Sequence, residues 1–211
     1  MIEIAANTKA ANSNRLSQWL FDPFRFIAGF KALLLGLAII LISVFVGSFS
    51  NTHFDGVLDV HTGLKAPLWI FFAEGLIDWG CMVVPLFFFG LIVSRSSFRM
   101  IDVFGTQALA RWPYLITSVA MLPEANQRVI VYIMSKLTQT APAAAISYID
   151  VFVFAFAMLL SIFMVIWMVA LMYRAYVVSC NIKGAAAITT FIVSLIGAEV
   201  LSKFAILSLL V

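Results

Sequence analysis

Long apolar segments joined by charged loops are the feature that most limits what this chain can fold into. The clearest of them covers residues 32–49 and is a near-unbroken series of leucine, isoleucine and valine. A helix needs about 20 apolar residues to cross a typical bilayer, so this segment is close to that length. With 64% hydrophobic and 11% charged residues, a chain of 211 residues cannot enclose its apolar side chains in water. We therefore predict an integral membrane protein of the all-α class.

The sequence predicts a polytopic membrane helix bundle of about five transmembrane segments, the third of them short. Three further segments are long enough to cross, at residues 67–93, 147–173 and 184–207. The apolar piece at 112–122 crosses only if it takes in residues from Gly105 onward; otherwise it is re-entrant and the bundle has four crossings. The span count therefore stays open between five and four.

The rest of the chain is expected to form connections within one domain. Residues 94–111 space their apolar side chains as a helix lying on the membrane surface would. Residues 1–18 are polar and are predicted to be a flexible N-terminal segment. No glycine-, proline- or serine-rich linker divides the sequence, so residues 1–211 are interpreted as a single domain.

Lysine and arginine are distributed unevenly between the loops. In either topology most of them fall on the same side as the N-terminus, which the positive-inside rule places in the cytoplasm. The net charge of +3 is therefore explained by topology, and we expect no nucleic-acid partner.

Three stretches of sequence resemble the Yip1 domain family of small multispanning membrane proteins. They are DPFRF at residues 22–26, FRMIDVFGTQALARWPYLI at 98–116 and MYRAYVVSCNIKGAAAI at 172–188. The resemblance implies five spans. Eukaryotic members resemble trafficking factors that bind small prenylated GTPases, but this chain lacks their long polar N-terminal region and their DLYGP-type motif. The resemblance therefore implies a prokaryotic-type protein of the bacterial cytoplasmic membrane.

Four charged residues are predicted to lie within the spans. Glu74 and Asp78 are four residues apart and so share one helix face, as do Glu199 and Lys203. A carboxylate facing lipid costs on the order of 3 kcal/mol even on a lenient scale, so the acids must face other helices or water. In the five-span model both pairs lie in the outer half and can form one intramembrane polar cluster. The alternatives are a pairing of the acids with another basic group, and a pairing of Glu199 with Lys203 alone.

A second candidate site lies in the polar loop before residue 67. His53, Asp55, Asp59 and His61 are closely spaced there, and imidazole and carboxylate groups together suit zinc or another transition metal. The same residues are typical of a flexible polar loop, or of a lid over the polar cluster. The spacing matches no established metal motif, and we expect no cofactor.

Arg111 and Arg174 stand beside aromatic residues near the ends of predicted spans. This pattern is typical of interfacial basic anchors and also suits contact with anionic lipid. No HExxH, GxGD, GxSxG or nucleotide-binding glycine motif is present, so we predict that the protein is not an enzyme.

The leading hypothesis for function is a noncatalytic protein that organises membrane lipid or partner proteins. The alternative is a small transporter or channel whose polar path runs through the four intramembrane charges. Spans rich in phenylalanine and small residues also predict packing against copies of the chain or another membrane protein.

Overall fold

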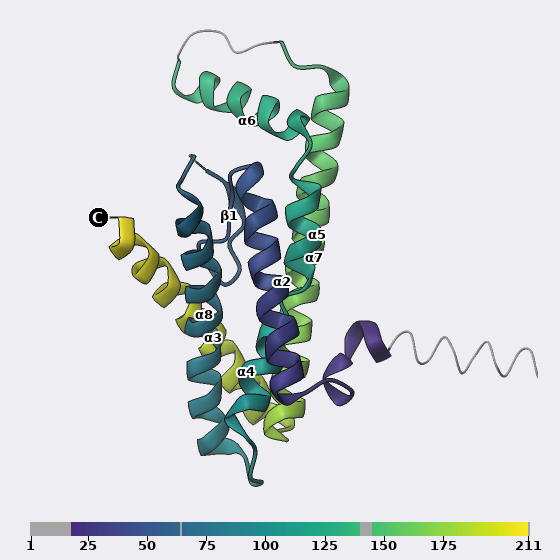
Figure 1. Ribbon diagram of the computed structural model, residues 1–211, viewed down its shortest axis with the longest axis vertical. Helices are drawn as coiled ribbons and strands as arrows, with labels where there is room; N and C mark the ends of the chain where they lie inside the picture. The colour runs from purple at the N-terminus through teal and green to yellow at the C-terminus, as the bar shows by residue number, and fades with distance from the viewer. Residues whose placement is uncertain (1–17, 64, 140–144, 211) are drawn as a thin grey trace, which may run out of the picture.

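The computed structural model describes residues 18–63, 65–139 and 145–210, and these form a helical bundle with one short hairpin (Figure 1). All but one residue of the predicted flexible segment, 1–18, lies outside the described residues. The elements in chain order are η1 (Pro23–Arg25), α2 (Gly29–Phe49), β1 (Thr52–His53), β2 (His61–Thr62), α3 (Leu68–Val93), α4 (Met100–Leu109), α5 (Pro113–Ala120), α6 (Glu124–Leu137), α7 (Tyr148–Cys180) and α8 (Gly184–Leu210).

Four helices, α2, α3, α7 and α8, are long and apolar enough to cross a bilayer. They coincide with the four long spans predicted from the sequence. Large apolar side chains remain exposed on their outer surfaces, such as Phe88 on α3, Phe163 on α7 and Phe204 on α8. Exposed side chains of this kind fit a lipid environment, so the helices support an integral membrane protein.

Residues 94–111 do not form the surface helix that the sequence predicts. Most of this stretch is α4, which packs against the first half of α2 and buries residues 105–109. The chain then turns and continues as α5 against the second half of α2, where Ser118 Oγ donates a 2.8 Å hydrogen bond to Ser43 O. The two short helices therefore follow α2 in the same direction, one after the other (Figure 1).

Glycines explain why α4 lies so close to α2. A Cβ atom on Gly36 would lie 2.3 Å from the backbone nitrogen of Leu109, and one on Gly105 would lie 2.5 Å from the carbonyl oxygen of Gly29. The two helices therefore meet backbone to backbone, as small residues allow in membrane helix packing. A hydropathy pattern cannot show a backbone contact of this kind. For this reason the prediction of a membrane-surface helix at residues 94–111 was wrong.

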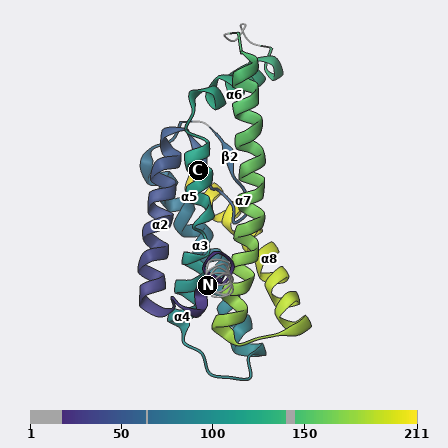
Figure 2. The same ribbon diagram turned by 90° about the vertical axis from the view of Figure 1, so that its right-hand side faces the viewer.

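The segment between α2 and α3 folds back into the bundle. We call residues 50–63 the hairpin loop: β1 and β2 pair antiparallel, with His53 opposite His61. Its centre is buried, since Phe54 and Val57 are at most 2% exposed, and Tyr114 Oη donates a 2.7 Å hydrogen bond to Val57 O. At its start the loop also meets α6, where Gln127 Nε2 donates a hydrogen bond to Ser50 O, and Figure 2 shows α6 above the hairpin.

Helix α8 is held mainly by α3 and makes few contacts with α7, its neighbour in the chain. The turn between α7 and α8 is tight, with Asn181 and Gly184 both at positive φ. In Figure 1, α8 leaves this turn and leans away from α7. Near the turn α8 is also held by α7, where Tyr176 Oη and Thr190 Oγ1 are 3.0 Å apart, so the attachment of its far end must come from α3 or from the hairpin loop.

Candidate functional site

Glu74 of α3 binds the start of the hairpin loop. Its Oε1 is joined to His53 Nδ1 by a 2.8 Å hydrogen bond, and its Oε2 accepts a 3.3 Å hydrogen bond from the backbone N–H of Phe54. Glu74 is 3% exposed, and the His53 ring also stacks on Phe71 with ring centroids 4.4 Å apart. The carboxylate is thus satisfied by protein groups and does not face lipid.

The second intramembrane pair, Glu199 and Lys203, joins α8 to the second half of the hairpin loop. Glu199 Oε2 accepts a 2.8 Å hydrogen bond from the backbone N–H of Leu58. Lys203 Nζ forms an ion pair with Asp59 and lies 3.7 Å from Glu199 Oε1. Gly56 makes this approach feasible, because a Cβ there would lie 2.5 Å from Glu199 Oε1.

Asp78 and Arg111 are the most deeply buried charged residues of the described chain, at 0% and 2% exposure. Asp78 lies one helical turn beyond Glu74, and Arg111 is the neighbouring cation that acts favourably on its charge, although no ion pair within 4 Å joins them among the described residues. Arg111 lies between α4 and α5, where it lines a small cavity with Ser43 and Tyr114. The two opposite charges are therefore both buried in the interior of the bundle without a direct ion pair between them.

The burial of Arg111 corrects its prediction as an interfacial anchor. The neighbouring Trp112 and Pro113 suggested the end of a span, but the break between α4 and α5 lies beside the middle of α2. One sequence signal could have indicated that Arg111 is buried. Asp78 lies within a predicted span, and an acid there favours a basic residue inside the bundle.

Three of the four predicted cluster residues are linked through the hairpin loop. Glu74 binds one end of the loop, while Glu199 and Lys203 bind residues 58 and 59. Among the ion pairs of the described residues, Lys203 is paired with Asp59 and Glu199, and none includes Asp78. The structure therefore shows a loop held between α3 and α8, while Asp78 and Arg111 are buried in the bundle.

Three of the four predicted metal ligands lie together. Ligand atoms of Asp55, Asp59 and His61 are within 4.8 Å of one another, whereas His53 Nδ1 is bound to Glu74. Two carboxylates and one imidazole suit a transition metal. However, the Lys203 ammonium already pairs with Asp59, so a metal ion would have to displace it or share that carboxylate.

The attachment of the hairpin loop is expected to depend on pH through His61 and Asp55. His61 Nδ1 lies 3.3 Å from Asp55 Oδ1, and this ion-pair contact raises the pKa of His61 above 6.5 and lowers the pKa of Asp55 below 3.8. The histidine contributes stability below pH 6.5 that is lost as pH rises through its raised pKa. The aspartate contributes stability above pH 3.8 that is lost as pH falls through its lowered pKa. The loop should therefore be held most firmly between pH 3.8 and pH 6.5.

Hydrogen exchange of the loop amides, corrected for the intrinsic effect of pH, checks this expectation. Protection should be greater at pH 6 than at pH 8 in the unchanged protein, and H61Q should remove most of the difference. Equal protection at both pH values would contradict a role for this pair.

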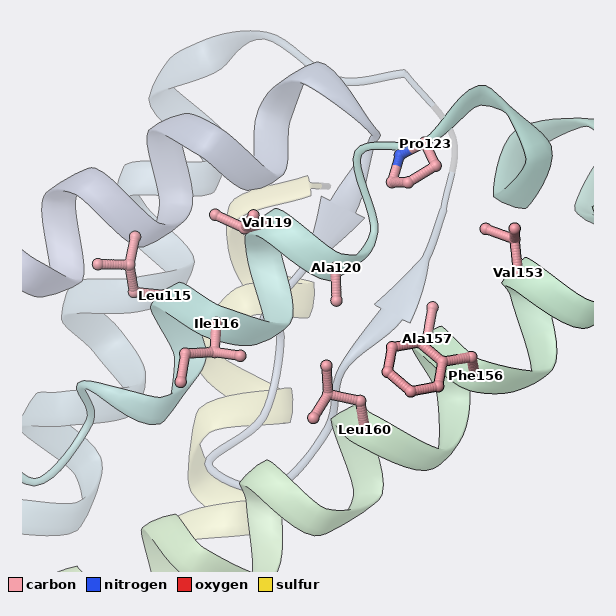
Figure 3. A pocket seen from close by; sticks show the side chains of 9 residues that line it. All are labelled: Leu115, Ile116, Val119, Ala120, Pro123, Val153, Phe156, Ala157 and Leu160. Atoms are coloured by element: carbon pink, nitrogen blue, oxygen red, sulfur yellow. The ribbon is translucent and has the colours of Figure 1, made fainter. Parts of the chain in front are cut away.

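Arg174 lies near the C-terminal end of α7, where it forms an ion pair with Asp22 just before η1. Its side chain is 40% exposed, in contrast to buried Arg111. An apolar groove of about 380 Å³ lies elsewhere, between α5 and α7 (Figure 3). Its lining side chains are all uncharged, from Leu115 on α5 to Leu160 on α7, so it offers a packing surface without reactive groups.

Comparisons of the chain with protein-family models, with curated proteins and with solved structures find no match. The assignment of function must therefore proceed from the geometry of the described residues.

Proposed function

We propose that the protein is a noncatalytic, Yip1-like integral membrane protein that organises membrane lipid or partner proteins. The observation that carries this proposal is the use of the intramembrane charges inside the fold. Glu74, Glu199 and Lys203 are each bonded to the hairpin loop, and Asp78 is buried in the interior of the bundle, as Arg111 is. Through these contacts the charged side chains join α3, α8 and the hairpin loop, and we call this set of contacts the clasp. The outer faces of the bundle are then free to recognise lipid or partner proteins.

We propose further that α4 and α5 together make a fifth crossing. In support, they follow α2 along its length, and their combined residues 100–120 equal α2 in number. A crossing there places the start of α2 and the end of α8 on opposite sides of the membrane. The end with η1 carries most of the exposed basic residues, among them Arg25, Arg95 and Arg174, so this end is proposed to face the cytoplasm of a bacterium.

The substitution E74Q tests the clasp. It removes the charge that binds His53 and Phe54 N–H, and we expect exchange of the Phe54 amide about tenfold faster, since 1.4 kcal/mol corresponds to a factor of ten. Vesicles containing E74Q should have the same low permeability to protons and cations as vesicles with the unchanged protein. E124Q is the matched control, because Glu124 is on α6 with a side chain 92% exposed.

A transporter or channel remains the second candidate, favoured by the depth that the polar residues reach. They extend from half-exposed His61 through the loop to fully buried Asp78 and Arg111. If unchanged protein carries ions across vesicles, and E74Q with D78N folds normally but abolishes that flux, the transporter replaces the organising role. Faster loop exchange without any flux supports the clasp.

A further inference from the structure

A groove at the η1 end of the bundle combines charged and apolar walls. It has a volume of about 770 Å³ and lies between α7 and the segment that leads through η1 into α2. The lining residues are Gln18, Phe21, Asp22, Arg25, Phe26, Ala170, Leu171 and Arg174. Its walls thus come from two parts of the chain about 150 residues apart, which the fold brings together.

One carboxylate binds two guanidinium groups in this groove. Asp22 is 8% exposed, and its Oδ2 accepts a 2.8 Å hydrogen bond from Arg25 Nε and another from Arg174 Nη2. Two positive charges on one negative charge leave the groove with a net positive charge. Each guanidinium carries five N–H donors, and the side chains of Arg25 and Arg174 are 65% and 40% exposed. The groove is therefore complementary to an anion that accepts several hydrogen bonds.

The apolar walls favour a lipid over a free anion. Phe21 and Phe26 are more than half exposed, and both are fixed by aromatic contacts. Phe26 stacks on Trp19 with ring centroids 5.1 Å apart, and Phe21 packs on Trp167 at 5.6 Å. Exposed aromatic rings beside arginine are typical of the headgroup level of a membrane, where a phosphate and the start of an acyl chain lie together.

We propose that this groove binds an acidic phospholipid. Arg25 and Arg174 bind the phosphodiester, Asp22 pairs with both guanidiniums while the groove is empty of lipid, and the acyl chain runs along Phe21, Phe26 and Ala170. The inference deepens the proposed function, on which it rests for the kind of ligand and for placing the groove at the cytoplasmic leaflet.

Lipid competition on the full-length protein tests the site. Native mass spectrometry of protein purified in detergent should show a preference for phosphatidylglycerol over phosphatidylcholine of matched chain length. R25Q and R174Q should each reduce that preference about fivefold, as expected for one arginine near an anionic headgroup. R95Q is the matched control, because Arg95 is an exposed arginine at the same end that does not line the groove, and it should keep the preference.

D22N separates binding from local folding. Without the carboxylate, no negative charge in the groove competes with the phosphate for Arg25 and Arg174. The preference for phosphatidylglycerol should therefore be kept or increase. A loss as large as in R174Q would show that the arginines act only by holding η1 against α7, and would overturn the proposal. Equal binding of the two lipids by the unchanged protein would overturn it as well.

One further outcome distinguishes a lipid ligand from free phosphate. A second distinguishes failure of the lipid site from failure of the organising function. If inorganic phosphate displaces phosphatidylglycerol at similar concentration, the apolar walls contribute nothing and a lipid site is wrong. If the lipid preference behaves as expected but vesicles with the unchanged protein conduct ions, the lipid site stands and the organising function fails. The two proposals are thus tested by different measurements.

Discussion

Replacing Arg111 with glutamine is expected to lower the free energy of unfolding by about 1–3 kcal/mol, because the change removes a cation that acts favourably on buried Asp78. Arg111 is 2% exposed and Asp78 is fully buried, so the remaining carboxylate has no water to solvate it. Ser202 is the other group that favours its charge, and a hydroxyl compensates a buried carboxylate less than a guanidinium does. D78N should be destabilising for the converse reason.

The double variant R111Q/D78N distinguishes a charge pair from two separately important side chains. If the two charges compensate each other, the double variant should be more stable than the sum of the single effects predicts, because no uncompensated charge remains. Unfolding of the purified protein in mixed micelles, followed by circular dichroism, measures all three variants. Additive effects would mean that Asp78 and Arg111 do not interact, and R95Q should leave stability nearly unchanged.

The long spans could be predicted from the sequence because a bilayer sets a simple requirement of length and apolarity. Glu74 and Asp78 could also be singled out, since an acid within a span needs a partner inside the fold. The identity of each partner could not. Arg111 was assigned to the interface because hydropathy treats a charge next to Trp112 and Pro113 as the end of a span, whereas the chain there only turns between α4 and α5.

The role of the hairpin loop in binding the intramembrane acids has a physical reason that amino-acid composition does not show. Backbone N–H groups in the interior of a helix are already bonded, so a buried carboxylate can obtain backbone donors only from a helix N-terminus or a non-helical segment. The loop supplies the N–H groups of Phe54 to Glu74 and of Leu58 to Glu199. Its histidines and aspartates suggested either a metal site or a lid, but its amides, which carry no sequence signal, bind the intramembrane acids.

The contact between α2 and α4 is a further property that sequence patterns did not reveal. Glycine in a helix normally weakens it by about 1 kcal/mol relative to alanine, so Gly36 alone gives no reason to expect a stabilising role. In the structure, the space beside its Cα is filled by the backbone of Ala108 and Leu109. The absence of a side chain is what lets α4 take its place along α2.

We therefore expect G36A to destabilise the protein by about 1–3 kcal/mol, the range for overpacking a tight core, because a new methyl group would meet backbone atoms at 2.3–2.4 Å. Backbone cannot rotate away as a side chain can, so α4 would have to move. G80A is the matched control on α3, where a Cβ would meet nothing within 4 Å, and it should stabilise the helix by up to about 1 kcal/mol.

The opposite signs expected for G36A and G80A make the comparison decisive. Both add one methyl group to a glycine inside a long membrane helix, so differences in helix propensity cancel between them. Thermal unfolding in the same detergent should rank G36A below the unchanged protein and G80A at or above it. If both variants were stabilised alike, α2 and α4 would not be in backbone contact, and the course of α4 and α5 along α2 would lose its physical basis.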